Sequence, residues 1–441
     1  MEDIGVVLER HEQQIKALKK DMSDLHGVQS EIRSMHETLV VPSTELKHTK
    51  EPKELSYHGK SSTRKNYDCK LWIYPRKCDI MKKNTIRSKQ MDLWKMLAAT
   101  EKTVVMYGMG NGADKILAVC EKYGVTVADF FASDGFVRGQ SFHGKVVLSF
   151  SDVKEKYGAE NIIVLVSFAS SLPDVMAQIG AVAAECETYV PDVPVRGETL
   201  FCEEYYDENR ENIEKALSLL ADERSREVFS GVLEFRRTGN LDVLLKTADD
   251  RTDVMQEMLD LDAYRVAVDL GAYDGDTARE LTVLCPNIEK IVAFEPDRRN
   301  YRKLSAYAES EPRVEAINAA AWNENGVICF DDSGNRNAGL YEEGAKRRAE
   351  VKALTVDGVC ASEAVDFIKY DVEGSEREAI EGSADTIRRH RPDLLISLYH
   401  RTEDLHELIL QIHALCPEYK LYVRRYPYIP AWDLNLYATV K

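Results

Sequence analysis

The sequence lacks the cysteine patterns of a disulfide-rich or zinc-binding protein. Its nine cysteines are an odd number, and no two of them are spaced as C-x-x-C. Scattered cysteines of this kind are typical of free thiols in a reducing compartment. We therefore expect a cytoplasmic protein that has neither a disulfide framework nor a structural metal site.

Long apolar runs and a surplus of basic residues are also missing. No apolar run approaches the ~20 residues that span a bilayer, and residues 1–10 contain no basic start that leads into an apolar stretch. Asp and Glu number 75 against 58 Lys and Arg, which gives a formal charge of −17. Because clustered Lys and Arg bind a phosphate backbone, this charge argues against a nucleic-acid partner. We therefore expect a protein that is not secreted, does not span a membrane and does not bind nucleic acid.

Residues 1–41 carry a heptad pattern. Its members follow one another in alternating steps of four and three: Ile4, Leu8, His11, Ile15, Leu18, Met22, Leu25, Gln29, Ile32, His36 and Leu39. A 3.5-residue spacing predicts a left-handed coiled coil. An isolated helix of this kind has little stability, so we expect it to join copies of the chain into a homo-oligomer. The alternative is an amphipathic helix that folds back on its own chain.

Residues 42–90 predict a basic, flexible linker. Between positions 47 and 89 there are 13 Lys and Arg against 4 Asp and Glu, and Pro42, Pro52 and Gly59 interrupt any helix. Sparse hydrophobic residues and high net charge are typical of segments that do not fold alone.

Two stretches alternate between strand and helix patterns, at residues 91–197 and 263–441, and a helical connector of residues 198–262 separates them. In the first, Thr103–Tyr107 reads as a buried strand before a glycine-rich turn and a helix that ends near Tyr123. Such alternation predicts a parallel sheet covered by helices, so we expect a Rossmann-like α/β domain here.

The second stretch predicts a doubly wound parallel sheet. Strands are expected at 265–270, 290–294, 313–318, 365–370 and 394–398. Only a turn region separates the last two expected strands, 419–424 and 434–440, so they should form an antiparallel hairpin.

The strongest functional signal is the run Val-Asp-Leu-Gly-Ala-Tyr-Asp-Gly-Asp-Thr at 268–277. Here a strand ends in a carboxylate, and two glycines four positions apart open into a helix. The glycines allow a ligand to approach the backbone closely. Three Asp side chains (269, 274 and 276) would repel a pyrophosphate and attract a positively charged group, such as a sulfonium or an ammonium.

Four further strand ends lie at the same expected edge of the sheet. Glu295 follows Gly271 by 24 positions, where sheets of this type hold ribose hydroxyls. Small residues near Asn318 and Ala320 would leave room for a flat base. Asp371 ends the fourth strand, and His400 follows the fifth.

Residues 263–441 resemble the FkbM family of S-adenosylmethionine-dependent methyltransferases. The resemblance rests on VDLGAYDGDT, AFEPD, IKYDVEGSEREAIEGS, LLISLYHRTEDL and the final YKLYVRRY…LNLYATVK hairpin. It implies a class I methyltransferase fold and methyl transfer from S-adenosylmethionine, usually to a hydroxyl oxygen of a glycan or other natural product. The implied cofactor-binding residues are Asp269, Gly271, Ala272, Tyr273, Gly275, Thr277, Glu295, Pro296, Asp297, Asn318, Ala320 and Asp371.

The chain departs from many family members at the end of the fifth strand, where it has Ser397 instead of a glutamate. Two candidates for the general base therefore remain, His400 and Asp371, with Lys369 or Glu373 steering the acceptor. Each has a second interpretation: His400 could cap a helix, Asp371 could hold the charged end of the cofactor, Glu373 could stabilise a turn, and Lys369 could pair with a carboxylate. Asp371, Glu373 and Asp393 could alternatively chelate Mg²⁺, although no compact metal-ligand spacing is present.

The first sheet domain carries Gly108-x-Gly110-x-Gly112 without the third glycine of the dinucleotide motif, and Ala113 follows. Asp134 could still meet a ribose, and His143 is the one nearby group able to transfer protons. The segment is similar to nucleotide- or sugar-nucleotide-binding Rossmann-like domains. We expect this domain to help recruit a saccharide or sugar-nucleotide acceptor. The alternatives are a catalytically silent scaffold and a nicotinamide-dependent oxidoreductase.

Overall fold

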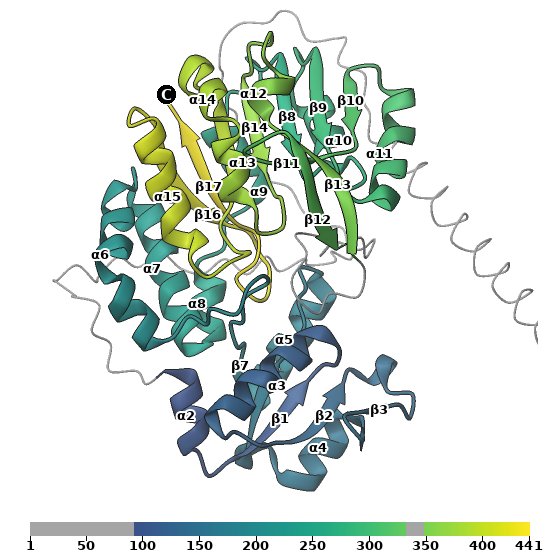
Figure 1. Ribbon diagram of the computed structural model, residues 1–441. Helices are drawn as coiled ribbons and strands as arrows, with labels where there is room; N and C mark the ends of the chain where they lie inside the picture. Colours follow the sequence, from purple (N-terminus) through teal and green to yellow (C-terminus); the bar gives the residue numbers. More distant parts are fainter. Residues whose placement is uncertain (1–91, 332–347) are drawn as a thin grey trace, which may run out of the picture. The chain divides into compact units, whose positions relative to one another are not determined.

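The computed structural model describes residues 92–331 and 348–441, all of which lie within the compact unit 84–441 (Figure 1). The expected coiled coil (1–41) and basic linker (42–90) lie outside the described residues and stay predictions. Among the described helices, none combines the length and the apolar sequence that crossing a bilayer requires.

The first sheet has five parallel strands in the order β5-β2-β1-β6-β7. They are β1 (Thr103–Tyr107), β2 (Val127–Ala132), β5 (Leu148–Ser149), β6 (Ile162–Val166) and β7 (Glu187–Tyr189). The accompanying helices are α2 (Leu93–Ala99), α3 (Asn111–Tyr123), α4 (Phe150–Tyr157) and α5 (Pro173–Glu185), and β3 (Ser141–Phe142) pairs with β4 (Lys145–Val146) in a small hairpin. The α/β pattern expected from the sequence is confirmed.

Four helices follow the first sheet: α6 (Glu203–Leu219), α7 (Glu223–Thr238), α8 (Leu241–Lys246) and α9 (Arg251–Met258). Asp222, Asn240 and Asp250 precede α7, α8 and α9, and each side chain accepts hydrogen bonds from backbone N–H groups of the first turn. Such caps satisfy donors that the helix itself leaves unpaired. The sequence therefore fixes where three of these four helices begin.

The second sheet has seven strands in the order β10-β9-β8-β14-β15-β17-β16. They are β8 (Val266–Leu270), β9 (Lys290–Phe294), β10 (Val314–Ile317), β14 (Phe367–Tyr370), β15 (Asp393–Ser397), β16 (Lys420–Arg425) and β17 (Leu434–Thr439). The first five are parallel, whereas β17 is antiparallel to both β15 and β16. The last two strands form the expected antiparallel pair.

Alternate residues of the strands enter two different cores, one on each face of the sheet. On β8, Val268 and Leu270 belong to the core formed with α12 (Val356–Val359), α13 (Glu376–Glu381), α14 (Ala384–His390) and α15 (Asp404–Leu415). Ala267 faces the opposite core, which contains residues of α9, α10 (Asp276–Leu284) and α11 (Arg298–Ser310). Burial on both faces explains the continuous apolar runs from which the parallel strands were expected.

A third, small sheet was missed in the sequence. It has the order β11-β13-β12, from strands β11 (Ala320–Ala321), β12 (Gly326–Asp331) and β13 (Arg348–Leu354). β12 and β13 pair antiparallel, and β11 contributes only two residues. A two-residue strand has no readable period, because alternation becomes visible only over several residues.

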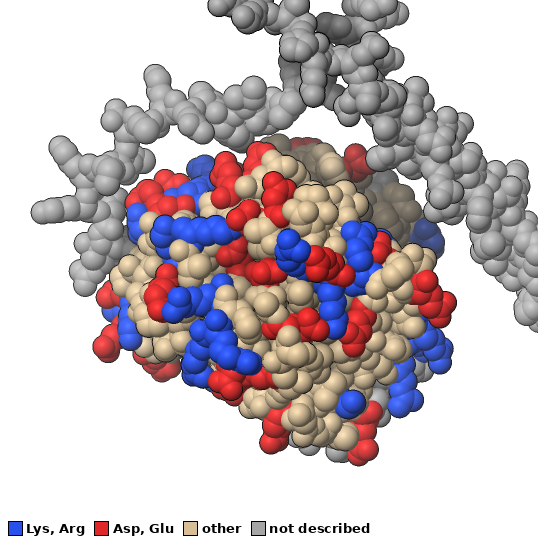
Figure 2. Space-filling model, turned by 90° about the horizontal axis from the view of Figure 1, so that it is seen from above, with Lys and Arg blue, Asp and Glu red and all other residues tan. Residues whose placement is uncertain are grey.

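The helices α6–α8 are tied to β16 by backbone and side-chain contacts. Ala221 N donates to Leu421 O at 2.8 Å, and Asp249 N donates to Arg425 O at 2.7 Å. On the surface drawn in Figure 2, Lys and Arg are interspersed with Asp and Glu.

The buried Arg425 side chain also connects β16 to these helices, and its contribution to stability can be tested. Its guanidinium donates to Thr247 Oγ1 at 2.8 Å and to the carbonyl oxygens of Leu244, Tyr426 and Tyr428. We expect Arg425→Leu to lower the free energy of unfolding by about 2–4 kcal/mol, because buried acceptors lose their donors. Urea unfolding followed by circular dichroism measures this.

The matched control is Arg265→Leu, which breaks an ion pair with Glu289 in which both side chains are more than 60% exposed. We expect it to change the unfolding free energy by less than about 1 kcal/mol. Equal losses in the two variants would contradict the role given to Arg425.

Candidate functional site

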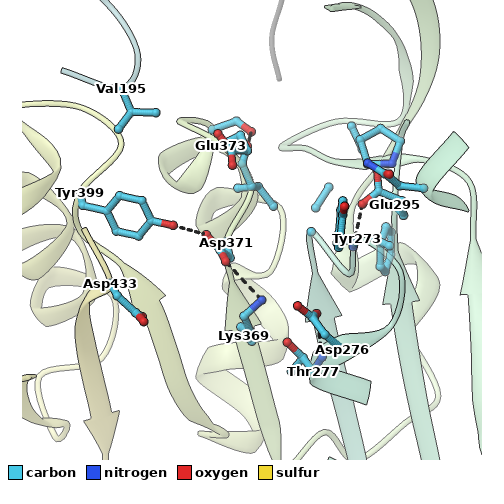
Figure 3. Close-up of a pocket in the computed structure, with 18 of the residues that line it drawn as sticks. Val195, Tyr273, Asp276, Thr277, Glu295, Lys369, Asp371, Glu373, Tyr399 and Asp433 are labelled. Carbon is cyan, nitrogen blue, oxygen red and sulfur yellow. Dashed lines mark hydrogen bonds and ion pairs between the residues drawn. The ribbon is translucent and has the colours of Figure 1, made fainter. Parts of the chain in front are cut away.

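A cavity of about 510 Å³ lies at the carboxyl edge of the second sheet (Figure 3). One side is lined by the loops after β8 and β9, including Gly271, Tyr273, Thr277, Glu295 and Pro296. The other side is lined by Lys369, Asp371 and Glu373 together with residues from outside these loops: Val195, Arg251, Tyr399, Tyr428, Trp432 and Asp433. The volume lies within the range typical of small-molecule sites.

The glycine loop after β8 lies in direct contact with the strand beside it. Gly271 has φ +85°, and a Cβ atom there would lie 1.9 Å from the carbonyl oxygen of Asp371. No larger residue fits this approach or favours this backbone conformation. Gly275, with φ +90°, precedes α10 and offers no capping side chain, although Asp276 Oδ1 accepts from Thr277 N at 2.8 Å in the first turn. The loop therefore brings bare backbone to the cavity.

Glu295 is held by the backbone on both carboxylate oxygens. Oε2 accepts from Tyr273 N and Oε1 accepts from Asp297 N, each at 2.8 Å. Burial raises the pKa of Glu295 to about 8, although these N–H groups oppose the shift. A carboxylate oxygen has two acceptor sites, so each oxygen keeps one for a ligand hydroxyl. Figure 3 shows Glu295 and Tyr273 on the side of the cavity opposite Tyr399.

A buried lysine lies between two strand-end carboxylates. Lys369 Nζ is 3.5 Å from Asp269 Oδ1 and 3.4 Å from Asp371 Oδ2. Burial raises the pKa of Asp269 to about 6, and its Oδ2 has no hydrogen-bond partner. The pKa of Asp371 is lowered: burial would raise it, but the charges of Lys369 and His400 outweigh that effect. Lys369 thus pairs with carboxylates, as the second interpretation of this residue in the sequence analysis predicted.

Glu373 extends from the turn after β14 into the cavity. Its backbone has φ +56°, which is uncommon for a residue other than glycine and is found often at functional sites. Oε2 is buried without a hydrogen-bond partner and lies 3.8 Å from Arg196 Nη2. Burial raises the pKa of Glu373 to about 7, while the charges of His400 and Arg196 limit the rise. This carboxyl group can exchange a proton near neutral pH.

His400 is fully buried and does not line the cavity. Its Nδ1 lies 2.9 Å from Glu376 Oε1, and its Nε2 lies 3.6 Å from Asp371 Oδ1. Burial alone would lower the pKa of His400, but the carboxylates of Glu376, Glu373 and Asp371 raise it to about 10. The ring does not cap α15, whose first turn begins after Glu403.

The remaining sequence-predicted residues lie in or behind the loops of the cavity. Pro296 and Ala320 line it, and Ala272 is buried behind it. Asp297 caps α11, because its Oδ1 accepts from Arg299 N and Asn300 N. Asn318 Nδ2 donates to the carbonyl oxygens of Glu295 and Pro296 at 2.8 and 3.2 Å. Asn318 therefore braces the loop that presents Glu295.

Several lining residues were not found by sequence reasoning. Tyr399 stacks with Trp432, which lies beside Tyr428, so three aromatic rings stand together on one side of the cavity. Tyr428, Trp432 and Asp433 belong to the turn between β16 and β17, and Val195 follows the first sheet. Tyr399 lies within LLISLYHRTEDL, but no motif marks the other four residues, because folding brings them from elements that are distant in the sequence.

The cavity lining has more acidic than basic side chains. Six acidic side chains (Asp276, Glu280, Glu295, Asp371, Glu373 and Asp433) face two basic ones, Arg251 and Lys369. A cationic ligand would be attracted to such a lining, whereas a diphosphate would be repelled. Of the three loop aspartates, only Asp276 lines the cavity, since Asp269 is buried and Asp274 pairs with Arg279 at 3.4 Å.

The magnesium site that the sequence analysis considered, with Asp371, Glu373 and Asp393 as ligands, is wrong, because the structure does not bring these three residues together. Asp393 begins β15 and accepts from Tyr264 Oη at 2.6 Å, whereas Asp371 follows the last residue of the parallel neighbour β14. The two carboxylates therefore lie at opposite edges of the sheet and cannot share an ion. Within residues 92–331 and 348–441, no group of three or more His, Cys, Asp or Glu is placed to hold a metal.

A second cavity of about 220 Å³ lies at the glycine turn of the first sheet. Gly112 and Lys115 line it on one side, and Val195 and Trp432, which also line the larger cavity, line it on the other. Lys115 Nζ donates to the carbonyl oxygens of Pro194 and Val195 at 2.9 and 2.7 Å.

The sequence analysis also singled out His143 and Asp134 in the first sheet domain. His143 Nε2 lies 2.8 Å from Asp114 Oδ1 on the exposed surface, and Asp134 begins a short 3₁₀ turn.

The second sheet unit matches a known family. Residues 269–421 fit the family model of the methyltransferase FkbM domain. The matched segment contains the glycine loop, Glu295, Asp371, Glu373 and His400. This part of the chain is an FkbM methyltransferase domain.

Solved structures agree with this fold. The crystal structure of methyltransferase FkbM from Methylobacillus flagellatus KT has a TM-score of 0.59 and 20% identity, and the match covers 78% of this chain and 92% of that one. At this identity the similarity shows the fold alone. No curated protein matches the chain.

Two further structures cover smaller parts of this chain. Fibrillarin from Aeropyrum pernix, in complex with natively bound S-adenosyl-L-methionine, has 15% identity and a TM-score of 0.27, over 40% of this chain and 67% of that one. An rRNA methylase from Streptococcus thermophilus has 14% identity and a TM-score of 0.28, over 42% and 92%. With TM-scores below 0.5, these two similarities add nothing to the fold assignment.

The raised pKa of Glu295 gives a test of the site's electrostatics. Because the folded protein binds this proton more tightly than the unfolded chain, the associated stability is present below pH 4.5 and is lost as the pH rises to about 8. Between pH 5 and 8.5 this effect should lower the Tm of the wild type. The Tm of Glu295→Gln should fall by about 5 °C less over the same range, because glutamine has no proton to lose. Differential scanning calorimetry measures this.

The exposed Glu289→Gln variant is the control and should follow the wild type across this pH range. A Glu295→Gln profile that runs parallel to that of the wild type would show that the carboxyl group is not buried as described.

Proposed function

We propose that this chain transfers a methyl group from S-adenosylmethionine to a hydroxyl oxygen of a saccharide or glycan. The observation that carries the proposal is an acidic cavity at the carboxyl edge of an FkbM methyltransferase domain, with Glu295 presented beside the glycine loop. When bound, S-adenosylmethionine supplies a methyl group on a positively charged sulfur. The residues of this chain must bind it, orient the acceptor and remove the acceptor's proton.

The residues on the glycine-loop side fit this cofactor. Glu295 keeps one acceptor site on each oxygen, which suits two ribose hydroxyls. Ala320 and Ala321 leave space in the lining for a flat base. The orphaned Asp269 Oδ2 and the carboxylate of Asp371 favour a cationic group at the floor of the cavity. We assign the remaining members of the predicted cofactor set, Ala272, Gly275, Asp297 and Asn318, to shaping these loops.

The opposite side of the cavity suits a saccharide acceptor. Tyr399, Tyr428 and Trp432 offer aromatic surface, and Glu373 and Asp433 offer carboxylate oxygens beside it. Hydroxyl groups can donate to the carboxylates while an apolar ring face packs on the aromatic side chains. Val195, from the segment after the first sheet, also lines this side. We therefore include the amino-terminal sheet unit in acceptor binding.

Glu373 is the general base that we propose among the four predicted catalytic residues. Both oxygens of Asp371 already have partners, because Oδ1 accepts from Ser397 and Tyr399 and Oδ2 pairs with Lys369. His400 lies behind the lining and its pKa is about 10. Glu373 combines a pKa of about 7 with an Oε2 atom that has no hydrogen-bond partner and only a long ion-pair contact, 3.8 Å, with Arg196 Nη2. A base is most effective when its pKa lies near the working pH.

The two alternatives gain less support. A nicotinamide-dependent oxidoreductase would need a dinucleotide site, but the cavity at Gly112 is about 220 Å³, below the range typical of ligand sites. A catalytically silent scaffold would not require Glu373 to adopt a backbone conformation with positive φ at the cavity.

Binding and transfer assays test the proposed activity. We expect S-adenosylmethionine to bind the wild type in calorimetric titration, and Glu295→Ala to weaken binding at least tenfold, because it removes both hydroxyl acceptors. Incubation with methyl-labelled S-adenosylmethionine and a panel of neutral oligosaccharides should label at least one sugar. Binding without transfer to any member would favour the scaffold, and binding of NAD instead would contradict the proposal.

Substitution of Glu373 tests the base. We expect Glu373→Gln to lower kcat by about 100-fold or more while the Kd for S-adenosylmethionine changes less than about twofold. In the wild type, the rate should rise with pH through about 7, where the carboxyl group loses its proton. Glu381→Gln, on the exposed surface of α13, is the matched control and should retain wild-type rates. Unchanged kcat in Glu373→Gln would remove Glu373 from the mechanism.

A further inference from the structure

His400 occupies a position that the proposed chemistry does not use directly. It follows β15, is fully buried, and lies behind the cavity lining. Its Nδ1 is fixed at 2.9 Å from Glu376 Oε1. Its Nε2 has no hydrogen-bond partner and faces two cavity carboxylates, at 3.6 Å from Asp371 Oδ1 and 3.9 Å from Glu373 Oε1. A buried polar nitrogen without a partner is costly unless charge attraction compensates.

We propose that His400 is a positioning residue of the methyltransferase site, an imidazolium whose charge holds the carboxylates of Asp371 and Glu373 in place. The role rests on the proposed function, because it acts through the residues that would bind the cofactor and remove the proton. His400 touches neither ligand itself. The structure instead gives the ring one short contact on its far side and two charge contacts on its cavity side.

Glu376 is the fixed point of this arrangement. It is buried, and its Oε1 also accepts from Val372 N at 3.0 Å while Oε2 accepts from Gly374 N at 3.1 Å. One carboxylate therefore anchors both the imidazole and the backbone turn that carries Glu373. The chain after the first sheet also contacts the backbone of His400, since Arg196 N donates to the carbonyl oxygen of His400 at 2.8 Å.

The charged groups around the ring explain its state. Glu376 comes from α13, and Asp371 and Glu373 come from the turn after β14. Asp404, at the start of α15, interacts electrostatically with His400, and burial raises the pKa of Asp404 to about 8. The phenol of Tyr399 lies beside the ring, with 4.2 Å between centroids. Carboxyl groups thus surround the imidazole, and they favour its charged form.

The charge state can be measured without a cofactor or an acceptor. We expect the full-length protein, labelled with ¹⁵N-histidine, to show one imidazole that keeps the nitrogen shifts of the charged form at pH 8.5, a signal absent from His400→Gln. Conversion of the His400 signal to the neutral form between pH 6 and 7.5 would overturn the proposal.

Two variants test the coupling to the carboxylates. Glu376→Gln should lower the titration midpoint of His400 by at least about one pH unit, because its closest charge partner is removed. His400→Gln should raise the midpoint of Glu373, followed by ¹³C-glutamate labelling, by about one unit. An unchanged Glu373 midpoint would leave His400 with a merely structural role. If His400→Gln does not fold, the titration of His400 in the wild type and in Glu376→Gln still tests the proposal.

His406→Gln is the matched control. His406 is a buried histidine on the neighbouring α15, and its Nε2 contacts Tyr205 Oη at 3.0 Å, away from these carboxylates. It should leave the titrations of His400 and Glu373 unchanged. Failure of methyl transfer with a charged His400 would reject the proposed function alone, whereas a neutral His400 in an active enzyme would reject only the positioning role.

Discussion

Mutual repulsion among carboxylates is the constraint that the site of this protein must overcome. Asp269, Asp371 and Glu373 lie near the carboxyl ends of two neighbouring parallel strands, where Asp269 is fully buried and the other two are partly buried. The structure places two cationic side chains among them: Lys369 between Asp269 and Asp371, and His400 between Glu376 and the cavity carboxylates. Without these charges, burial would favour protonation of the carboxylates and the cavity would lose its acidic character. The two cations thus allow an acidic, partly buried site to exist.

The cost of gathering these groups is met by the surrounding fold. Gly271 allows the loop after β8 to contact the backbone at Asp371, and Glu376 binds both His400 and the turn that carries Glu373. Contacts from outside the matched family segment add to this. Arg251 and Val195 line the cavity, and Arg425 joins the hairpin to the helix α8 and the residue that follows it, Thr247. The helical connector and the first sheet therefore take part in building the site.

Features that depend on local sequence were predictable. The glycine loop, Glu295 and Asp371 directly follow apolar runs, which identifies them as strand ends. Strands such as Lys290–Phe294 can be recognised as apolar runs. The aromatic side of the cavity was not predictable, because Tyr399 and Trp432 meet only after the hairpin pairs with β15. The charge of His400 could not be read from the sequence either, since it depends on three carboxylates that converge in space. The small sheet of β11, β12 and β13 was missed for a different reason, because β11 has only two residues and shows no alternation.

The most direct test is a crystal structure of the full chain with S-adenosylhomocysteine, the demethylated product of the proposed cofactor. The account predicts that its ribose hydroxyls lie within hydrogen-bonding distance of Glu295 and that its amino acid end lies near Asp269 and Asp371. A ligand bound elsewhere, or a cavity closed at Gly271 in crystals grown with excess ligand, would contradict the account.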